Sequence, residues 1–222
     1  GKLSRIIQPT AFSCNLTESP VDTEGSILLV GNSHADSIKS SFTKVAAQNS
    51  VATYFIVQNN PLMAGGLSPQ DIVNEAKLKN INHIVLHFSA GAITIERLKE
   101  VVSLSLRSAI KVSFIYPVPT WDVHIPKNMY YQLKGSAQSP NQTKQDYLAI
   151  HDLFFSEIEK ITSENFERFT VVDYLCQSGS VLYKDDDGTP FYFDSSHLTL
   201  TGAKALEELF IKVIKRNLTS KS

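Results

Sequence analysis

The feature that most limits the fold of this chain is a regular alternation of strand-like and helix-like segments. Short runs of apolar and β-branched residues, typical of strands buried on both faces, alternate with longer segments whose apolar residues recur at helical spacing. This order predicts an α/β fold, a three-layer sandwich with a five-stranded parallel sheet flanked by helices. The predicted strands are residues 27–30, 51–57, 81–88, 111–118 and 169–175. The predicted helices are residues 35–49, a segment opened by Ser68 and Pro69, and residues 93–110, 141–164 and 199–217.

The length and composition of the chain fit one domain of this kind. Its 222 residues are 42% hydrophobic and 19% charged, which is ordinary for a globular protein. Residues 1–25 contain many turn formers and are interpreted as an N-terminal arm or linker, and the domain itself is expected to span residues 26–222. Residues 119–140 contain three prolines and several polar side chains, which indicates a long irregular loop, and loops of that length are usually functional.

Charge and hydropathy exclude several classes of function. The net charge is −1 and the longest basic run is Lys215-Arg216, so the sequence lacks the basic face of a nucleic-acid-binding protein. No apolar run exceeds four residues, which excludes a membrane-spanning helix within these residues. No glycine-rich phosphate loop and no metal-ligand spacing occur, so neither a nucleotide nor a metal cofactor is expected.

The first candidate for chemistry follows the first predicted strand. Gly31, Asn32 and Ser33 connect that strand to the next helix. In a parallel sheet such a junction lies at the carboxyl ends of the strands, where ligands bind, and the Ser33 N–H lies at a helix start that stabilises anions. The same residue types also form ordinary turns and helix caps. Ser33 is therefore a candidate nucleophile only in combination with a base elsewhere in the chain.

A candidate base occurs near the other end of the sequence. Asp194 precedes His197 by three residues, in a turn before the last predicted helix. This spacing lets the carboxylate orient the imidazole, whose second nitrogen then accepts a proton from a serine hydroxyl. A lone histidine in such a place is commonly a surface or capping residue. Together, Ser33, His197 and Asp194 predict a hydrolase-type catalytic triad.

These two blocks resemble those of the SGNH (GDSL-type) esterase and acyltransferase superfamily, which has a flavodoxin-like α/β fold. The first block of that family is Gly-Asp-Ser, here residues 31–33, and its last block is Asp-x-x-His, here residues 194–197. More narrowly, Gly-Asn-Ser-His-Ala at 31–35 and Asp-Ser-Ser-His-Leu-Thr at 194–199 are similar to SGNH domains fused to the C-terminus of membrane acyltransferase-3 proteins. Those bacterial proteins O-acetylate surface polysaccharides such as the O-antigen of lipopolysaccharide.

The resemblance implies a role for each member of the triad. Ser33 is expected to attack an acyl donor, His197 to take up and return the proton, and Asp194 to hold the imidazole. The family has Asp at the position of Asn32, which is not a triad member. We therefore expect a local change in the turn and not a loss of catalysis.

The resemblance also implies an oxyanion hole, and here the chain departs from the family pattern. The family supplies the serine N–H, a glycine after the second strand and an asparagine after the third. The first two correspond to the Ser33 N–H and to Gly65 or Gly66, whereas no asparagine follows the third predicted strand. Ser89, the Gly91 N–H or a side chain of the long loop would have to replace the missing donor.

The resemblance further implies a cellular setting and partners. We expect the periplasmic domain of a bacterial inner-membrane protein, with an acyltransferase-3 membrane domain of the same polypeptide as its partner and a polysaccharide as the acyl acceptor. Residues 1–25 would then be the tether between the two domains. A periplasmic setting also favours a disulfide between Cys14 and Cys176. Two alternatives stay open: a carbohydrate O-acetyl esterase with the same triad, and a non-catalytic glycan-binding module.

The remaining candidates are single side chains. Trp121 and Tyr130 in the long loop are interpreted as sugar-stacking residues, with packing of the loop as the alternative. His83 and His87 lie on a predicted strand and are interpreted as core or edge histidines, because no third ligand has suitable spacing. Residues 185–187 lack the alternation of a calcium loop and are expected to form a solvated turn.

Overall fold

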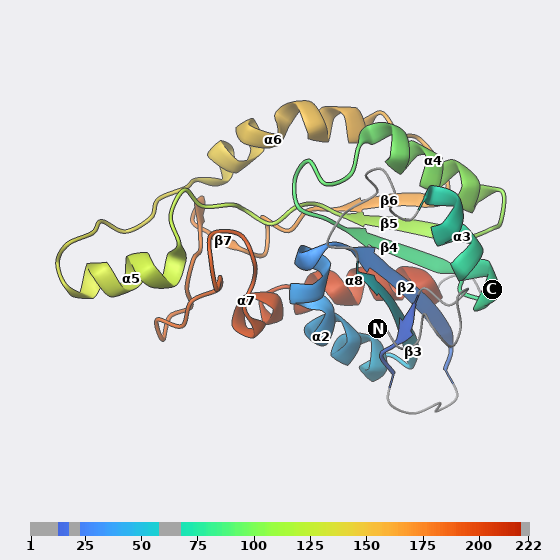
Figure 1. The fold of residues 1–222 in the computed structure, drawn as a ribbon, viewed down its shortest axis with the longest axis horizontal. Helices are drawn as coiled ribbons and strands as arrows, with labels where there is room; N and C mark the ends of the chain where they lie inside the picture. Colours follow the sequence, from blue (N-terminus) through green and yellow to red (C-terminus); the bar gives the residue numbers. More distant parts are fainter. Residues whose placement is uncertain (1–12, 18–22, 58–67, 219–222) are drawn as a thin grey trace.

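A six-stranded, mostly parallel sheet forms the centre of the structure, a computed structural model that describes residues 13–17, 23–57 and 68–218 (Figure 1). The strand order is β1-β3-β2-β4-β5-β6, and every neighbouring pair is parallel except β1 and β3. The sheet thus has the predicted parallel core, and a short antiparallel strand from the predicted N-terminal arm extends one edge. The strands are Cys14–Asn15 (β1), Gly25–Gly31 (β2), Val51–Val57 (β3), His83–His87 (β4), Lys111–Ile115 (β5) and Phe166–Phe169 (β6).

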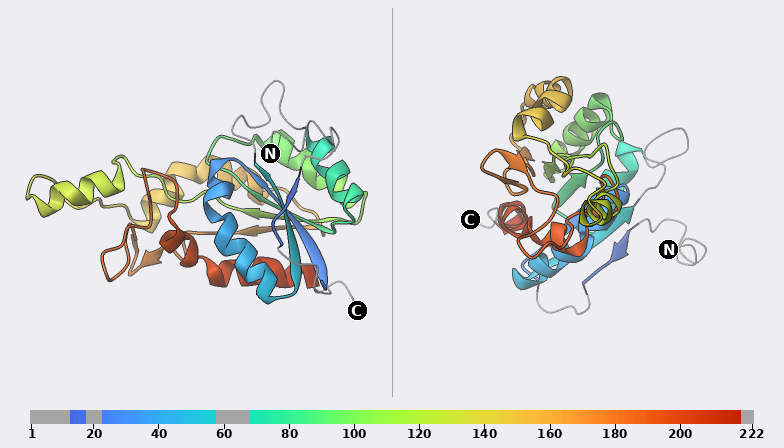
Figure 2. Two further views of the ribbon diagram at one scale, coloured as in Figure 1. Left: turned by 60° about the horizontal axis from the view of Figure 1, so that its bottom comes forward. Right: turned by 90° about the vertical axis from the view of Figure 1, so that its left-hand side faces the viewer.

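Helices form one layer on each face of this sheet, as Figures 1 and 2 show. On one face lie α3, α4 and α6, and on the other lie α2, α7 and α8, where α2 packs against both of its neighbours. The arrangement is the predicted three-layer α/β sandwich. No helix among the described residues is long and apolar enough to cross a membrane. The helices are Ser33–Gln48 (α2), Pro69–Leu78 (α3), Ile95–Leu106 (α4), Lys144–Glu159 (α6), Leu200–Lys204 (α7) and Glu207–Leu218 (α8).

The inner positions of the two central strands, β2 and β4, are apolar because helices cover both faces of the sheet. Ile27, Leu28 and Leu29 of β2 have no exposed surface, and Ile84 and Val85 of β4 are equally buried. Successive side chains of a strand point to opposite faces, so a strand covered on both faces has no position for a polar side chain facing water. This is why a continuous apolar run marks β2 in the sequence.

The last parallel strand was predicted at the wrong place. β6 lies earlier in the chain, and residues 171–175 form a helical turn in which the Leu175 N–H donates to the Val171 carbonyl at 3.3 Å. Val171, Val172 and Leu175 are fully buried, because positions i, i+1 and i+4 fall on one side of such a turn. The β-branched pair that suggested a strand therefore reflects burial alone.

Two further segments differ from the sequence-based expectation. Residues 119–140 contain a helix, Ile125–Leu133 (α5), which projects from the body of the molecule (Figure 1). Pro126 lies in its first turn, where the missing N–H of proline costs no helical hydrogen bond. The single helix predicted at 199–217 is divided into α7 and α8.

The predicted disulfide is also wrong, since Cys14 and Cys176 are both free. Cys14 lies on β1 at one edge of the sheet, whereas Cys176–Gln177 (β7) follows β6 at the other edge and pairs with Ser180–Val181 (β8) in a small hairpin. The two edges of a six-stranded sheet are roughly 24 Å apart. A disulfide tolerates a Cα separation of at most about 7 Å.

Candidate active site

The nucleophile turn, residues 31–33, is fixed by close packing at the carboxyl end of β2. A Cβ atom on Gly31 would lie 1.8 Å from the backbone oxygen of His87 on the neighbouring strand β4, so only glycine fits. Ser33 is the first residue of α2, and amides in the first turn of a helix have no acceptor within it. The turn therefore presents a serine hydroxyl beside backbone amides that suit an anion.

Asn32 connects the nucleophile turn to the loop that follows β4. Its Oδ1 accepts hydrogen bonds from the N–H of His34 at 3.1 Å and of Ser89 at 3.3 Å. Its Nδ2 donates to the Ser89 Oγ at 2.7 Å. An ionised aspartate accepts hydrogen bonds but cannot donate this last one. These bonds hold the loop that contains Ser89 and Gly91 against the nucleophile turn.

The acid–base turn, residues 194–197, meets the nucleophile turn at the same edge of the sheet. The Asp194 Oδ1 accepts from the N–H groups of Ser196 at 2.7 Å and His197 at 2.8 Å. Its Oδ2 lies 2.6 Å from the His197 Nδ1, and the His197 Nε2 lies 2.7 Å from the Ser33 Oγ. A carboxylate only accepts, so Nδ1 carries the hydrogen and Nε2 is left to accept from the serine hydroxyl. The three predicted residues thus form one hydrogen-bonded chain.

The ionisation of Asp194 suits this arrangement. Partial burial alone would raise the pKa of Asp194, but the backbone N–H groups of His197 and Ser196 and the His197 ring together hold it below its ordinary value. The carboxylate is therefore charged at neutral pH. A carboxylate that accepts from Nδ1 fixes the tautomer of the imidazole and favours its protonated form.

The long loop after β5 holds the acid–base turn in place. The backbone N–H of Trp121 donates to the Ser195 carbonyl at 2.8 Å, and the backbone N–H of Ile125 donates to the Asp194 carbonyl at 3.1 Å. The Trp121 indole is only 5% exposed and packs edge-on against Tyr192, at 5.9 Å between ring centroids. Trp121 therefore packs the loop against the core, which was the alternative to sugar stacking, and its ring is not available to a ligand.

Two buried histidines lie close to the triad. The His34 ring centroid is 4.6 Å from that of His197 and 6.3 Å from that of His87. Burial, with His87 and His197 nearby, lowers the pKa of His34 to about 3. Burial also lowers the pKa of His87 to about 4, although its Nδ1 donates to the Ile115 carbonyl. Both rings are neutral at neutral pH, so neither opposes a positive charge on His197.

A pocket of about 410 Å³ lies over the triad. The Phe193 ring is stacked on the His197 imidazole with 5.2 Å between centroids and 17° between planes, and the Phe193 side chain is 53% exposed. The Ser33 hydroxyl and the His197 ring therefore border an open space. The pocket is lined by Ser33, Asp36, Ser37, Phe193 and His197.

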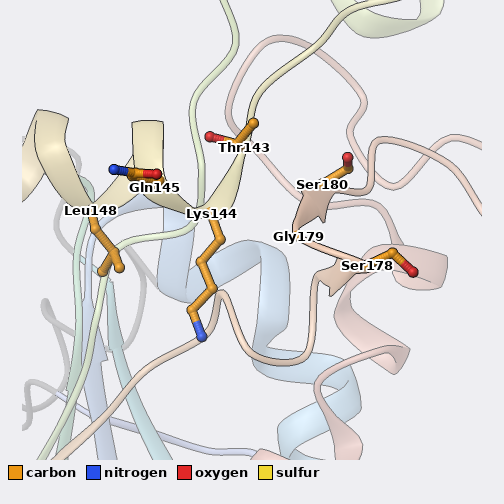
Figure 3. A pocket seen from close by; sticks show the side chains of 7 residues that line it. All are labelled: Thr143, Lys144, Gln145, Leu148, Ser178, Gly179 and Ser180. Atoms are coloured by element: carbon orange, nitrogen blue, oxygen red, sulfur yellow. The ribbon is translucent and has the colours of Figure 1, made fainter.

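A second pocket, of about 500 Å³, lies between the start of α6 and the β7–β8 hairpin (Figure 3). Thr143 caps α6, and the Lys144 ammonium group forms an ion pair with Asp173. None of the residues that the sequence suggested for catalysis lies in this pocket. Its lining residues are Thr143, Lys144, Gln145, Leu148, Ser178, Gly179 and Ser180.

The other predicted site residues have different outcomes. Gly65 and Gly66, the candidate oxyanion glycines, lie outside the described residues. Gly91 lies in the loop after β4 with a φ of +77°, a conformation that favours glycine. Tyr130 is 56% exposed on the projecting helix α5 and does not line the pocket over the triad. The oxyanion and Tyr130 assignments stay predictions.

His83 and His87 are core residues, as the sequence indicated. Both are fully buried, and the His83 Nε2 lies 2.8 Å from the Ser113 Oγ. Within the described part of the chain, no group of three or more His, Cys, Asp or Glu side chains is placed to hold a metal ion. Residues 185–187, which the sequence predicted as a solvated turn, are followed by a hydrogen bond from the Thr189 N–H to the Asp185 carboxylate at 2.6 Å.

Sequence reasoning missed three residues of the pocket, although each had a signal. Asp36 and Ser37 follow Ser33 by three and four positions on a helix, which places them on the same helical face as the nucleophile. Phe193 directly precedes Asp194. Spacing from the predicted triad was sufficient to find all three.

Known proteins resemble this chain in family and fold. Among solved structures, the periplasmic domain of the lipopolysaccharide acetyltransferase from Salmonella ser. Paratyphi A is similar with a TM-score of 0.61, covering 90% of this chain and 85% of that one. The sequence identity is 14%, so this likeness shows the fold alone. A search of curated proteins gave no significant match. A family model described as "SGNH domain (fused to AT3 domains)" matches residues 9–212, and the chain therefore belongs to that family.

Proposed function

We propose that this domain transfers an acetyl group to a sugar hydroxyl of a bacterial surface polysaccharide such as the O-antigen of lipopolysaccharide, with Ser33 as the nucleophile. One observation carries the proposal. The Asp194 carboxylate, the His197 ring and the Ser33 hydroxyl form a continuous chain with links of 2.6 and 2.7 Å. Membership of the AT3-fused SGNH family supports the reaction class, which is acyl transfer or hydrolysis.

In the first step, the Ser33 Oγ attacks the carbonyl carbon of an acyl donor while the His197 Nε2 takes its proton. A new bond forms between Oγ and the acyl carbon, and the carbonyl oxygen becomes an oxyanion beside the amides at the start of α2. When the bond to the leaving group breaks, His197 returns the proton to the departing atom. An acetyl ester of Ser33 remains.

In the second step, a sugar hydroxyl attacks this ester. His197 takes the hydroxyl proton, the bond between the acyl carbon and the Ser33 Oγ breaks, and the proton moves to that oxygen. Asp194 stabilises the imidazolium in both steps. Water in place of the sugar gives hydrolysis, which is the esterase alternative, and the same three residues would catalyse it.

We further propose that the acyl group reaches Ser33 from an AT3 membrane domain on the periplasmic side of a bacterial inner membrane. The family model describes SGNH domains that are fused to such domains, which supports this partner. The domain alone should then hydrolyse model esters slowly and fail to acetylate polysaccharide from acetyl-CoA. NMR detection of O-acetyl groups after mixing domain, acetyl-CoA and polysaccharide tests this, and efficient acetylation would contradict the relay.

A fluorophosphonate probe tests whether Ser33 is a nucleophile at all. We expect the wild-type chain to be labelled at Ser33, as located by peptide mass spectrometry, and the Ser33→Ala variant to stay unlabelled. Ser37→Ala is a matched control, because it removes a serine hydroxyl from the same pocket and leaves Ser33 in place. Absence of labelling in the wild type would favour the non-catalytic glycan-binding module.

A further inference from the structure

Phe193 is an aromatic ring held in a fixed orientation beside the reacting atoms. Its backbone N–H donates to the His197 carbonyl at 3.0 Å, which closes the acid–base turn. Its ring lies nearly parallel to the His197 imidazole, and more than half of the side chain remains exposed at the pocket. An aromatic face beside a few polar groups is a common way to bind and orient a small polar ligand.

The part of the pocket lining that belongs to α2 offers hydrogen-bond acceptors. The Ser37 Oγ donates its hydrogen to the His34 carbonyl at 2.7 Å, so towards a ligand this hydroxyl acts as an acceptor. The Asp36 Oδ1 accepts from the Lys39 ammonium group at 2.6 Å, and the Asp36 side chain is still 46% exposed. A carboxylate has lone pairs for further donors, and an exposed ion pair of this kind contributes little free energy. This wall therefore suits a ligand with several O–H donors.

We propose that Phe193, Asp36 and Ser37 form the acceptor subsite and that this subsite selects a neutral pyranose over an anionic sugar. The inference deepens the proposed function and rests on it. The Phe193 ring would pack against the C–H face of the sugar, and Asp36 and Ser37 would accept hydrogen bonds from its hydroxyls. With the sugar held in this way, one of its hydroxyls would face the acetyl ester on Ser33. A uronate, phosphate or sulfate would meet the Asp36 charge and be disfavoured.

A long acyl chain is a poorer occupant of the same pocket. Of the described residues that line it, Phe193 is the one large apolar side chain, and the others are polar or charged. An extended hydrocarbon chain needs continuous apolar walls to be removed from water. The pocket chemistry thus favours a sugar with a short acyl group.

The inference is tested by the fate of the acetyl-enzyme. The 222-residue chain is mixed with p-nitrophenyl acetate and either methyl α-D-glucopyranoside or the corresponding methyl glucuronoside, which differ in one carboxylate. Mass spectrometry measures acetylated sugar and NMR measures free acetate. The ratio of these products reports on the second step alone, because it does not depend on how fast Ser33 is acetylated.

We expect the wild type to acetylate the neutral glycoside in preference to the glucuronoside. Phe193→Ala should lower the product ratio for the neutral sugar about tenfold, and Asp36→Asn should lower it roughly tenfold. Asp36→Asn should also reduce the discrimination against the glucuronoside, since the repelling charge is gone. Glu96→Gln and Leu153→Ala are matched controls, an acidic residue in the first turn of α4 and an exposed apolar residue on α6, and should leave the ratio unchanged.

Two results would overturn the inference while leaving the proposed function intact. One is an unchanged product ratio in both pocket variants, and the other is equal use of the two sugars by the wild type. If no sugar is acetylated, binding is measured instead, by NMR shifts of the Phe193 ring when the methyl glucoside is titrated into Ser33→Ala. The inference is then rejected if that ring does not respond. Failure of fluorophosphonate labelling, in contrast, would reject the proposed function itself.

Discussion

The two turns that form the candidate active site are held in place in different ways. The nucleophile turn is fixed by the sheet itself, through the close approach of Gly31 to β4 and the cap that Asn32 places on α2. The acid–base turn lies on a long connection and is held by backbone hydrogen bonds from Trp121 and Ile125. A turn attached to a buried strand needs little outside support, whereas a turn on a loop depends on another loop. Substitutions that weaken one support at a time test this difference.

The largest expected effect comes from removing the reacting groups of either turn. We expect Ser33→Ala and His197→Ala each to lower hydrolysis of p-nitrophenyl acetate by at least ~1,000-fold, because triad members act as a unit. Asp194→Asn should reduce the rate comparably by favouring the wrong tautomer of His197. The melting temperature should change little, since these side chains lie at the rim of the sheet. Residual activity within tenfold of wild type in either alanine variant would contradict the assignment.

Removing the support of the acid–base turn should mainly cost stability. Trp121→Ala leaves a cavity beside Tyr192, and we expect a loss of about 3–5 kcal/mol in the free energy of unfolding. Activity should fall as well, because the loop that holds Asp194 is loosened. Urea unfolding and ester hydrolysis measure the two effects. Leu133→Ala, which removes an exposed side chain from α5, is the control and should change the stability by less than about 0.5 kcal/mol.

The support of the nucleophile turn can be tested at its closest contact. Gly31→Ala would push a methyl group against the His87 backbone, and such overpacking typically costs about 1–3 kcal/mol. Gly202→Ala is the comparison for the acid–base turn, because Gly202 lies in α7 just after that turn and its Cβ would lie 2.2 Å from the Phe191 oxygen. Both variants should be less stable, but Gly31→Ala should lose more activity because it displaces Ser33 directly. Equal losses of activity would mean that the two turns are equally deformable.

Lowering the pH should destabilise the folded chain through three buried histidines, two of which, His34 and His87, lie beside the nucleophile turn. His34, His83 and His87 have pKa values of about 3, 3 and 4 in the folded chain, well below the ordinary value of 6.5. Between about pH 6.5 and 4 the unfolded chain therefore binds protons that the folded chain does not, so stability falls as the pH is lowered. Each group contributes roughly 1 kcal/mol per pH unit in this range. The lowered pKa of Asp194 acts in the same direction but only at still lower pH.

The slope of stability against pH checks this expectation. Urea unfolding at several pH values should show a smaller slope for His87→Phe, which keeps a buried ring but cannot titrate. His124→Gln replaces an exposed histidine at the start of α5 and should leave the slope unchanged. An equal slope in wild type and His87→Phe would show that the buried imidazole is not responsible.

The fold and the meeting of the three candidate residues were predictable because their signals are local. The apolar run of β2 reports burial on both faces, and Ser33, Asp194 and His197 follow from short motifs. The misplaced last strand arose because the same local pattern is compatible with two kinds of structure. Val171 and Val172 are buried in a helical turn and not in a strand, since β-branched residues report burial as readily as strand structure.

The sequence by itself determined the α/β class, the edge of the sheet where the candidate site lies and the three residues of its hydrogen-bonded chain, because spacing and apolar periodicity decide these features. Only the tertiary structure decided how that triad is supported and what lines its pocket. Trp121 supports the acid–base turn from far away in the sequence, and Asn32 pairs with Ser89 across two loops. Such contacts join segments that become neighbours only after the chain has folded, so no local pattern encodes them.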